Sequence, residues 1–204
     1  SVRMSAAQLY DIVFDGNNKW MLSANGTIFT YEYEAIIPGL LKRWYEERQE
    51  MQRKMRDCGD NEIEREYWDK RQLVKKINLN SLYGAILNPG CRFFDMRIGQ
   101  SVTLTGRCIT KHMASKVNEI VAGKYDHKGE SVVYGDTDSV YFSAYKTLQK
   151  EINEGLIPWT KDSVLGLYDK IAEEVNGSFK SFMTRAFHTP STRGEVIAAG
   201  RELV

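Results

Sequence analysis

The chain has 204 residues, of which 42% are hydrophobic and 27% are charged, a composition that suits one globular domain or a compact domain with an insertion. Its 28 basic and 27 acidic side chains nearly cancel, so overall charge does not predict a nucleic-acid binder, and any such role must rest on local patches. No apolar run approaches the ~20 residues of a membrane span and no signal peptide opens the chain, which predicts a cytoplasmic protein, in the host cytoplasm if the source is viral.

The first 35 residues alternate short apolar runs with turn formers. Runs rich in β-branched and aromatic residues, bounded by glycine, asparagine and aspartate, are typical of strands joined by tight turns. The pattern predicts strands within 11–14, 20–24 and 26–34. Residues 1–35 are therefore assigned to part of a sheet domain.

Residues 36–85 predict two antiparallel helices joined by a short turn. Apolar side chains recur at helical spacing from about residue 36 to residue 56. A second helix is expected from residue 62 to about residue 84, with Asp60 or Asn61 as its N-cap. Because strand-rich segments flank this helical hairpin, we interpret it as an inserted lobe.

Residues 86–204 predict a second strand-containing region. After an irregular stretch around 88–90, the expected elements are helices at 101–121, 147–154 and 161–187, a β-hairpin at 132–142 and a last strand at 195–198. The predicted fold class is α+β, with a small antiparallel sheet backed by helices and an antiparallel helical hairpin inserted.

The sequence VVYGDTDSVYF, residues 132–142, places two carboxylates at the tip of the predicted β-hairpin. On an extended backbone residues i and i+2 project to one side, so Asp136 and Asp138 should point together, or nearly so if the turn bends between them. Carboxylates suit Mg²⁺, which binds through one or two of them plus substrate phosphates, and two such ions support phosphoryl transfer. The alternative is a solvated turn, because aspartate, glycine and threonine are common in turns.

The second predicted helix carries an unusual mixture of side chains on one face. The face consists of residues at i, i+4, i+7 and i+8, namely Lys76, Asn80, Tyr83 and Gly84. Lysine attracts phosphate, tyrosine offers a stacking surface, and glycine lets a ligand approach the backbone. This face suits a ligand with a phosphate group at one end and a flat ring at the other. The alternative is an ordinary amphipathic helix with solvated lysines.

Both segments resemble motifs of the family B DNA polymerases. KKINLNSLYGA, residues 75–85, resembles the fingers-helix motif lysine-x-x-x-asparagine-serine-x-tyrosine-glycine, and YGDTDS, residues 134–139, is similar to the palm motif. Further segments of the family, particularly of its phage replicative polymerases, are resembled by three more stretches of this chain: ANGTIF, IIPGLLKRWYEERQEMQRK and SVTLTGR. The resemblance runs from about residue 24 to residue 198. It implies that the helical hairpin is the fingers and that the strand-containing parts belong to the palm.

The resemblance implies a metal site and a primer site on the palm hairpin. Asp136 and Asp138 would bind Mg²⁺, two ions in the complete enzyme, with Asp138 as a direct ligand of both. Tyr134 and Gly135 would lie near the primer terminus. Glu195 matches an acidic position on a strand beside the hairpin.

The resemblance also implies a nucleotide site on the fingers. Lys76 and Arg48 would hold the incoming deoxynucleoside triphosphate, and Lys76 would also act in catalysis by neutralising charge that grows in the transition state. Asn80 would support the sugar and phosphate region. Tyr83 and Gly84 would lie against the nascent base pair, where shape selects the correct pair.

Two departures from the family pattern are visible. Gln52 stands where a second basic residue usually follows the arginine matched by Arg48, so either Arg53 or Lys54 substitutes for it or the grip on the triphosphate is weaker. The upstream motif aspartate-x-x-serine-leucine-tyrosine-proline-serine, with the family's other metal-binding aspartate, does not occur, and neither do exonuclease and thumb segments. We interpret the chain as a fragment, from a truncated or a split gene, that does not polymerise alone.

The functional hypothesis is a fragment of a DNA-directed DNA polymerase that joins a nucleotide to a primer 3′-hydroxyl by two-metal catalysis. Its expected partners are primer-template DNA, deoxynucleoside triphosphates and the rest of the polymerase chain. No membrane partner is expected. An alternative is a catalytically silent, polymerase-like module that binds DNA or scaffolds partners. A polymerase that copies RNA is a third hypothesis, against which the fingers motif argues.

Overall fold

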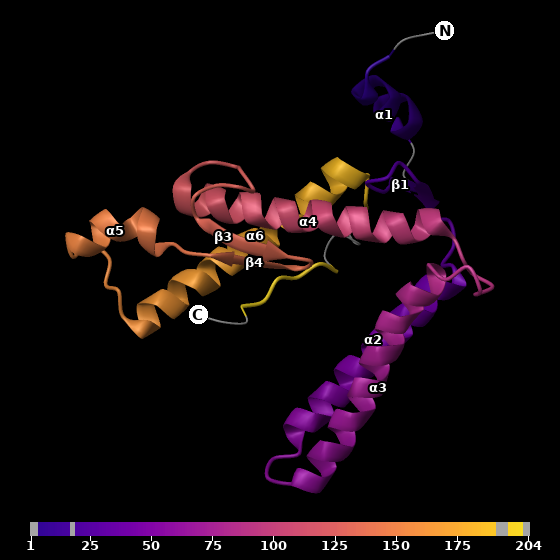
Figure 1. Ribbon diagram of the computed structural model, residues 1–204, viewed down its shortest axis with the longest axis horizontal. Coiled ribbons are helices and arrows are strands. Elements are labelled where there is room, and N and C mark those ends of the chain that lie inside the picture. Colours follow the sequence, from indigo (N-terminus) through magenta and orange to yellow (C-terminus); the bar gives the residue numbers. More distant parts are fainter. Residues whose placement is uncertain (1–3, 17–18, 191–195, 202–204) are drawn as a thin grey trace. The chain divides into compact units, whose positions relative to one another are not determined.

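The computed structural model describes residues 4–16, 19–190 and 196–201. In chain order its elements are α1 (Ala6–Phe14), β1 (Trp20–Leu22), β2 (Ile28–Thr30), α2 (Ile36–Asp57), α3 (Glu62–Ile86), α4 (Met96–Ala122), β3 (Val132–Asp136), β4 (Ser139–Phe142), α5 (Tyr145–Asn153) and α6 (Lys161–Phe187) (Figure 1). β1 pairs with β2, and β3 pairs antiparallel with β4. The predicted α+β class is confirmed.

The chain divides into two compact units. One unit consists of residues 30–100, and the other consists of residues 1–29 together with residues 101–204. In neither unit does the described part of the chain contain a helix with the length and apolar character needed to cross a membrane.

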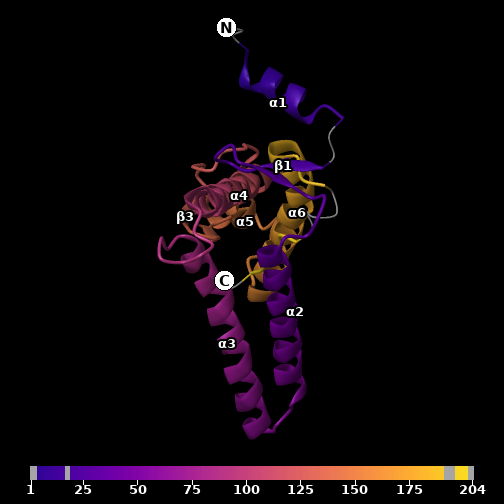
Figure 2. The ribbon, with the colours of Figure 1, turned by 90° about the vertical axis from the view of Figure 1, so that its right-hand side faces the viewer.

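The unit of residues 30–100 is built on α2 and α3, which run antiparallel side by side, as Figure 1 and Figure 2 both show. Asn61 caps α3 with its side chain, which makes it the cap among the two predicted candidates. Between the helices, Lys75 forms an ion pair with Glu47, and Arg48 Nε donates to Gln72 Oε1 at 3.1 Å. No residue of α2 is fully buried, so polar contacts of this kind contribute to the pairing of the two helices.

The other unit contains a buried apolar cluster between α4 and α6. Val117 of α4 packs with Ile171, Val175 and Phe179 of α6, and none of the four is more than 3% exposed. The three α6 residues are spaced at i, i+4 and i+8, so they form one stripe along the helix. Phe142 of β4 packs against the same cluster, which fixes the β3–β4 hairpin on the two helices.

One of the three strands predicted near the start of the chain is wrong, whereas β1 and β2 form where they were expected. Residues 11–14 belong to α1, a helix that begins with a capping box. The backbone N–H of Gln8 donates to Ser5 Oγ at 3.2 Å, and the backbone N–H of Ser5 donates to Gln8 Oε1 at 2.8 Å. Phe14, at the end of this helix, is buried, and its ring centroid lies 4.7 Å from that of His188. The capping signal and this long-range contact outweigh the strand-like composition.

The strand predicted at 195–198 is also wrong, as far as the described residues 196–198 show. Glu195 itself lies outside the described residues. The side chain of Asn176 on α6 replaces a neighbouring strand here: its Nδ2 donates to the carbonyl of Ala199 at 2.9 Å, and its Oδ1 accepts from the N–H of Ala199 at 2.7 Å. Ala199 thereby pairs both of its backbone groups without joining a sheet.

Two predicted helices begin earlier than expected. α4 starts at Met96 because Asp95 caps it, with Asp95 Oδ1 accepting from the backbone N–H of Arg97 at 2.9 Å. The side-chain hydrogen bonds from Arg97, together with this backbone bond, lower the pKa of Asp95 to about 2. α5 starts at Tyr145, two residues before its predicted start.

His112 is a buried titratable residue on α4, 7% exposed. Its Nε2 lies 2.9 Å from Ser178 Oγ, and its Nδ1 lies 2.7 Å from Tyr125 Oη. Ser178 Oγ donates its only hydrogen to the carbonyl of Val175, so the neutral ring donates from Nε2 to Ser178 and accepts at Nδ1 from Tyr125. Burial lowers the pKa of His112 below its usual 6.5, and the nearby Lys116 lowers it further.

This arrangement predicts an acid-dependent loss of stability. The unfolded chain binds a proton at His112 at a higher pH than the folded chain does. The free energy of unfolding should therefore fall from about pH 6.5 downward, by at most about 1.4 kcal/mol per pH unit, until the pH passes the lowered pKa of the folded state. Urea unfolding of the chain between about pH 8 and about pH 5 measures this slope. We expect His112→Phe to have a shallower slope, and an equal slope in both proteins would refute the assignment.

Candidate active site

The β3–β4 hairpin carries the two aspartates at its tip. Asp136 pairs with Ser139 as the last pair of the ladder, so Thr137 and Asp138 form a two-residue turn. Thr137 has φ 27°, a value that costs free energy for a β-branched residue. The Thr137 hydroxyl donates to Asp136 Oδ1 at 3.0 Å, which orients that carboxylate.

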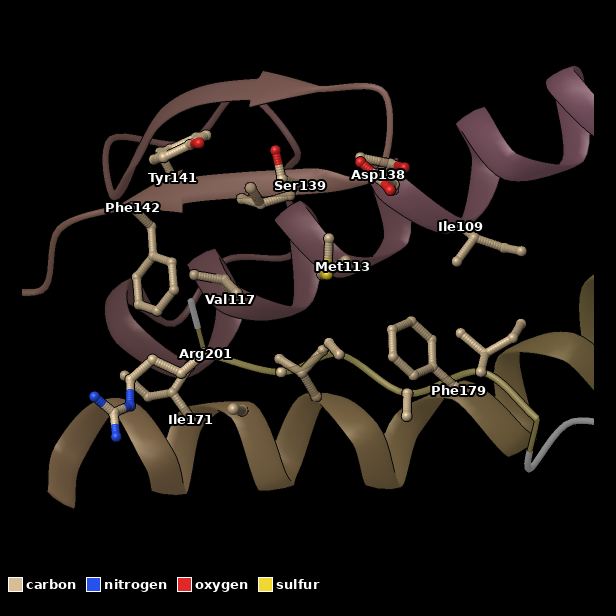
Figure 3. Close-up of a pocket in the computed structure, with 18 of the residues that line it drawn as sticks. Ile109, Met113, Val117, Asp138, Ser139, Tyr141, Phe142, Ile171, Phe179 and Arg201 are labelled. Carbon is tan, nitrogen blue, oxygen red and sulfur yellow. The ribbon is translucent and has the colours of Figure 1, made fainter. Parts of the chain in front are cut away.

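Asp138 lines a pocket between β4, α4 and α6 with a volume of about 600 Å³. Figure 3 shows the pocket, with Asp138 at the hairpin tip near one end and Arg201 at the other. Between them, Met113, Val117 and Phe179 point inward from the two helices. The pocket is therefore mainly apolar inside and carries a carboxylate at the tip of the hairpin.

Asp136 lines a different pocket, of about 470 Å³, between α4 and β3. Three basic side chains also line this pocket, those of Arg107, Lys111 and His127. The neighbourhood of Asp136 is therefore rich in groups that attract anions.

The two carboxylates thus line pockets on two sides of the hairpin tip. The expectation that Asp136 and Asp138 point together rested on an extended backbone, and it included a bend in the turn as the exception. Asp138 lies in the turn and not in a strand, and the positive φ of Thr137 redirects the chain between the two aspartates.

The residues expected near a primer terminus are exposed on the same hairpin. The Tyr134 ring lies 5.8 Å from the Tyr141 ring on the paired strand, and the two side chains are 58% and 46% exposed. At Gly135 an added Cβ would meet only the Ser139 carbonyl, at an ordinary contact distance of 3.7 Å. The described packing therefore leaves room for a side chain at Gly135.

The expected nucleotide face lies on α3, in the other unit. Lys76, Asn80 and Gly84 are exposed on this helix, and Tyr83 is half-buried with its hydroxyl 3.5 Å from the carbonyl of Gly99. No heavy atom of the described residues would lie within 4 Å of a Cβ at Gly84, apart from the helix's own backbone. A glycine inside a helix costs about 0.5–1 kcal/mol relative to alanine, and the packing of this unit does not require it.

Three basic residues of α2 that bear on the triphosphate assignment make contacts within their own unit. Arg48 is half-buried and bonded to Gln72 of α3. Arg53 and Lys54 both pair with Glu50, at 2.7 Å and 3.7 Å. The hydrogen bond from Arg53 is the main reason why the pKa of Glu50 is lowered. The two neighbours that could replace a basic residue at position 52 therefore share one carboxylate, which offsets only one of their two charges.

The donor chemistry of the hairpin fits Mg²⁺ in part. Among the described residues, no three or more histidine, cysteine, aspartate or glutamate side chains come together in a group that could hold a metal ion. Asp136 and Asp138 are nevertheless exposed carboxylates, and Mg²⁺ is often held by one or two carboxylates with water and substrate phosphates. The two aspartates would hold such an ion only together with further oxygen ligands.

Residues 7–181 match the protein family described as DNA polymerase family B. The chain belongs to this family. The DNA-directed DNA polymerase of Escherichia phage RB69 is 40% identical to this family B chain over 80 residues, 39% of this chain and 9% of that protein. The corresponding enzyme of Enterobacteria phage T4 is 39% identical over 82 residues, again 39% of this chain and 9% of the relative.

An archaeal relative matches a longer stretch of the family B chain. The DNA polymerase of Pyrococcus glycovorans is 28% identical over 183 residues, which make up 86% of this chain and 22% of that polymerase. The chain therefore spans less than a quarter of the length of each of these three relatives.

Sequence reasoning missed the residues of α4 that face the hairpin of this family B chain. Arg107 and Lys111 are spaced at i and i+4, a signal for one shared helix face, but their position beside Asp136 depends on how α4 packs on β3. Thr110 touches the hairpin tip through its hydroxyl, and no local pattern distinguishes it from other helical threonines.

Proposed function

We propose that the chain supplies part of the polymerase site of a DNA-directed DNA polymerase, which transfers a nucleotide to a primer 3′-hydroxyl with release of pyrophosphate. The observation that carries the proposal is membership of DNA polymerase family B over residues 7–181, together with the exposed carboxylates at the β3–β4 tip. Residues 36–85 would be the fingers, and residues 1–35 and 86–204 would belong to the palm.

Asp136 and Asp138 would hold Mg²⁺ at the hairpin tip, with Asp138 contacting both ions of the complete enzyme. When bound, the ions would stabilise charge on the attacking and leaving oxygens of the phosphoryl transfer. Tyr134 and Gly135 would lie against the primer terminus. The room beside Gly135 supports this role, because glycine permits an approach that a side chain would block.

The exposed face of α3 would bind the incoming deoxynucleoside triphosphate. Lys76 would place its charge on the phosphates, with Asn80 beside the sugar, and Arg48 would add a second cation once it leaves Gln72. Tyr83 and Gly84 would lie against the nascent base pair. An exposed glycine that the packing of this unit does not require supports this role.

The cations near Asp136 would attract the phosphate backbone of primer-template DNA. Arg107 and Lys111 are both exposed and line the same pocket as Asp136. Charge of this kind supplies sequence-independent, salt-sensitive affinity for nucleic acid. The near-neutral overall charge of the chain is compatible with such a local patch.

The chain by itself would not extend a primer. Among the described residues, two carboxylates stand at the hairpin tip, and the further metal ligand, the exonuclease and the thumb would come from the rest of the polymerase chain. The complete enzyme would act in the cytoplasm, or in the host cytoplasm if it is viral, without a membrane partner.

A nucleotide titration of the chain tests the proposed triphosphate site. We expect the chain to bind a deoxynucleoside triphosphate with Mg²⁺ weakly, and Lys76→Ala to weaken that binding about 10- to 100-fold, because a hydrogen bond to a charged group is lost. Lys70→Ala is the matched control, since Lys70 lies on the same helix and pairs with Glu66 at 2.7 Å. Isothermal titration calorimetry measures both. Equal affinities for the two variants would contradict the assignment of Lys76.

A further inference from the structure

The hydroxyl of Thr110 joins α4 to the tip of the β3–β4 hairpin. Its Oγ1 donates to the carbonyl of Thr137 at 2.9 Å and lies 3.2 Å from the carbonyl of Gly106, one turn earlier in α4. A hydroxyl has one hydrogen, so the two carbonyls share it, and the shorter distance favours Thr137. This hydrogen bond therefore runs directly from α4, a helix of the core, to the turn between β3 and β4.

The acceptor of this bond is Thr137, the residue of the hairpin that has a positive φ. Thr137 is a β-branched residue at φ 27°, a conformation that persists only where its surroundings hold it. Its carbonyl lies between the two aspartates in sequence, and its own hydroxyl donates to Asp136 Oδ1. Any movement of the Thr137 peptide therefore moves both carboxylates.

Thr110 and Thr137 also line both of the pockets at the tip. The Asp138 pocket and the Asp136 pocket thus meet at these two threonines and at Val140 of β4. A bond at that point fixes how the turn divides the two carboxylates between the two pockets.

We propose that Thr110 is a positioning residue for the metal site: its hydroxyl holds the strained Thr137 turn, and through it the carboxylates of Asp136 and Asp138. The inference rests on the proposed polymerase function. Thr110 touches neither substrate nor metal, and it acts only through the hairpin. Replacing a group that orients metal ligands in this way commonly weakens metal affinity about 10-fold or more.

The test compares Thr110→Val, which keeps the shape of the side chain and removes its hydroxyl, with Thr110→Ser, which keeps the hydroxyl. The matched control is Thr184→Val on α6, whose hydroxyl shares its one hydrogen between the carbonyls of Lys180, at 3.1 Å, and Thr189, at 3.0 Å. The variants are made in the polymerase that contains this chain. Amide hydrogen exchange of residues 132–142 is followed without metal, and the Mg²⁺ concentration for half-maximal primer extension is measured in parallel.

We expect Thr110→Val to speed exchange in the hairpin about fivefold, the effect of losing one ordinary hydrogen bond, without faster exchange along α4. The Mg²⁺ concentration for half-maximal activity should rise about 10-fold. Thr110→Ser should restore both values, and Thr184→Val should change neither.

Unchanged exchange in the hairpin of Thr110→Val would overturn the inference, and so would faster exchange confined to α4, which would mean a role in the helix alone. An Asp138→Asn variant assayed beside these separates failure of the proposed function from failure of the positioning role. If Asp138→Asn keeps full activity, the proposed function fails. If Asp138→Asn is inactive but Thr110→Val behaves as the unchanged enzyme, only the positioning role fails.

Discussion

Asp138→Asn in the complete polymerase proposed to contain this chain should lower the rate of nucleotide incorporation by about 10³-fold or more. The expected loss follows from the several kcal/mol that metal-held charge contributes to phosphoryl transfer, at about 1.4 kcal/mol for each factor of ten. An amide cannot supply the negative charge that holds Mg²⁺. Because Asp138 is exposed in the turn, its replacement should leave the fold and the thermal unfolding midpoint nearly unchanged.

Single-nucleotide incorporation under single-turnover conditions measures the chemical step directly. Glu130→Gln is a suitable control, because Glu130 is exposed and precedes the hairpin by two residues. Asp136→Asn should also be strongly impaired. If both aspartate variants kept the rate of the unchanged enzyme, the result would favour the alternative of a catalytically silent module that binds DNA.

Phe179→Ala should lower the free energy of unfolding of the chain by about 3–5 kcal/mol, the range found when a buried aromatic side chain is truncated. Phe179 is 1% exposed and packs with Val117, Ile171 and Val175. Truncation leaves a cavity between α4 and α6 that these neighbours cannot fill. Urea unfolding measures the change.

Glu173→Ala on the exposed face of α6 should shift the free energy of unfolding by no more than about 0.5 kcal/mol, since surface substitutions rarely do more. Because Phe142 of β4 packs on the same cluster, the truncation should also loosen the hairpin that carries the aspartates. A loss below about 1 kcal/mol for Phe179→Ala would mean that the cluster does not hold this unit together.

Most elements were predictable because their signals are local. α2 follows apolar spacing, whereas α3 and α6 also carry capping residues: Thr160 caps α6, and Asn61 caps α3 through a contact three residues away. The β3–β4 hairpin follows from two apolar runs around turn formers. The one early strand that failed, at 11–14, was also decided partly by a local signal: Ser5 and Gln8 carry a capping box that composition alone did not reveal.

The candidate site was only partly predictable. The sequence alone identified Asp136 and Asp138, and the face of α3 that bears Lys76. It did not show that the two carboxylates line different pockets, because that depends on the backbone conformation of Thr137. It also did not show that Arg53 is neutralised by Glu50.

The amino-acid sequence by itself thus determined α2, α3, α6 and the β3–β4 hairpin, the family of the chain and its candidate carboxylates, since each depends on residues close together in the chain. Tertiary structure alone decided what surrounds those residues. Thr110 and Thr137 are 27 residues apart, and Asn176 and Ala199 are 23 apart. Contacts over such separations form only when α4, α6 and the hairpin pack together, because packing and hydrogen bonding between elements select them, and periodicity within one element does not.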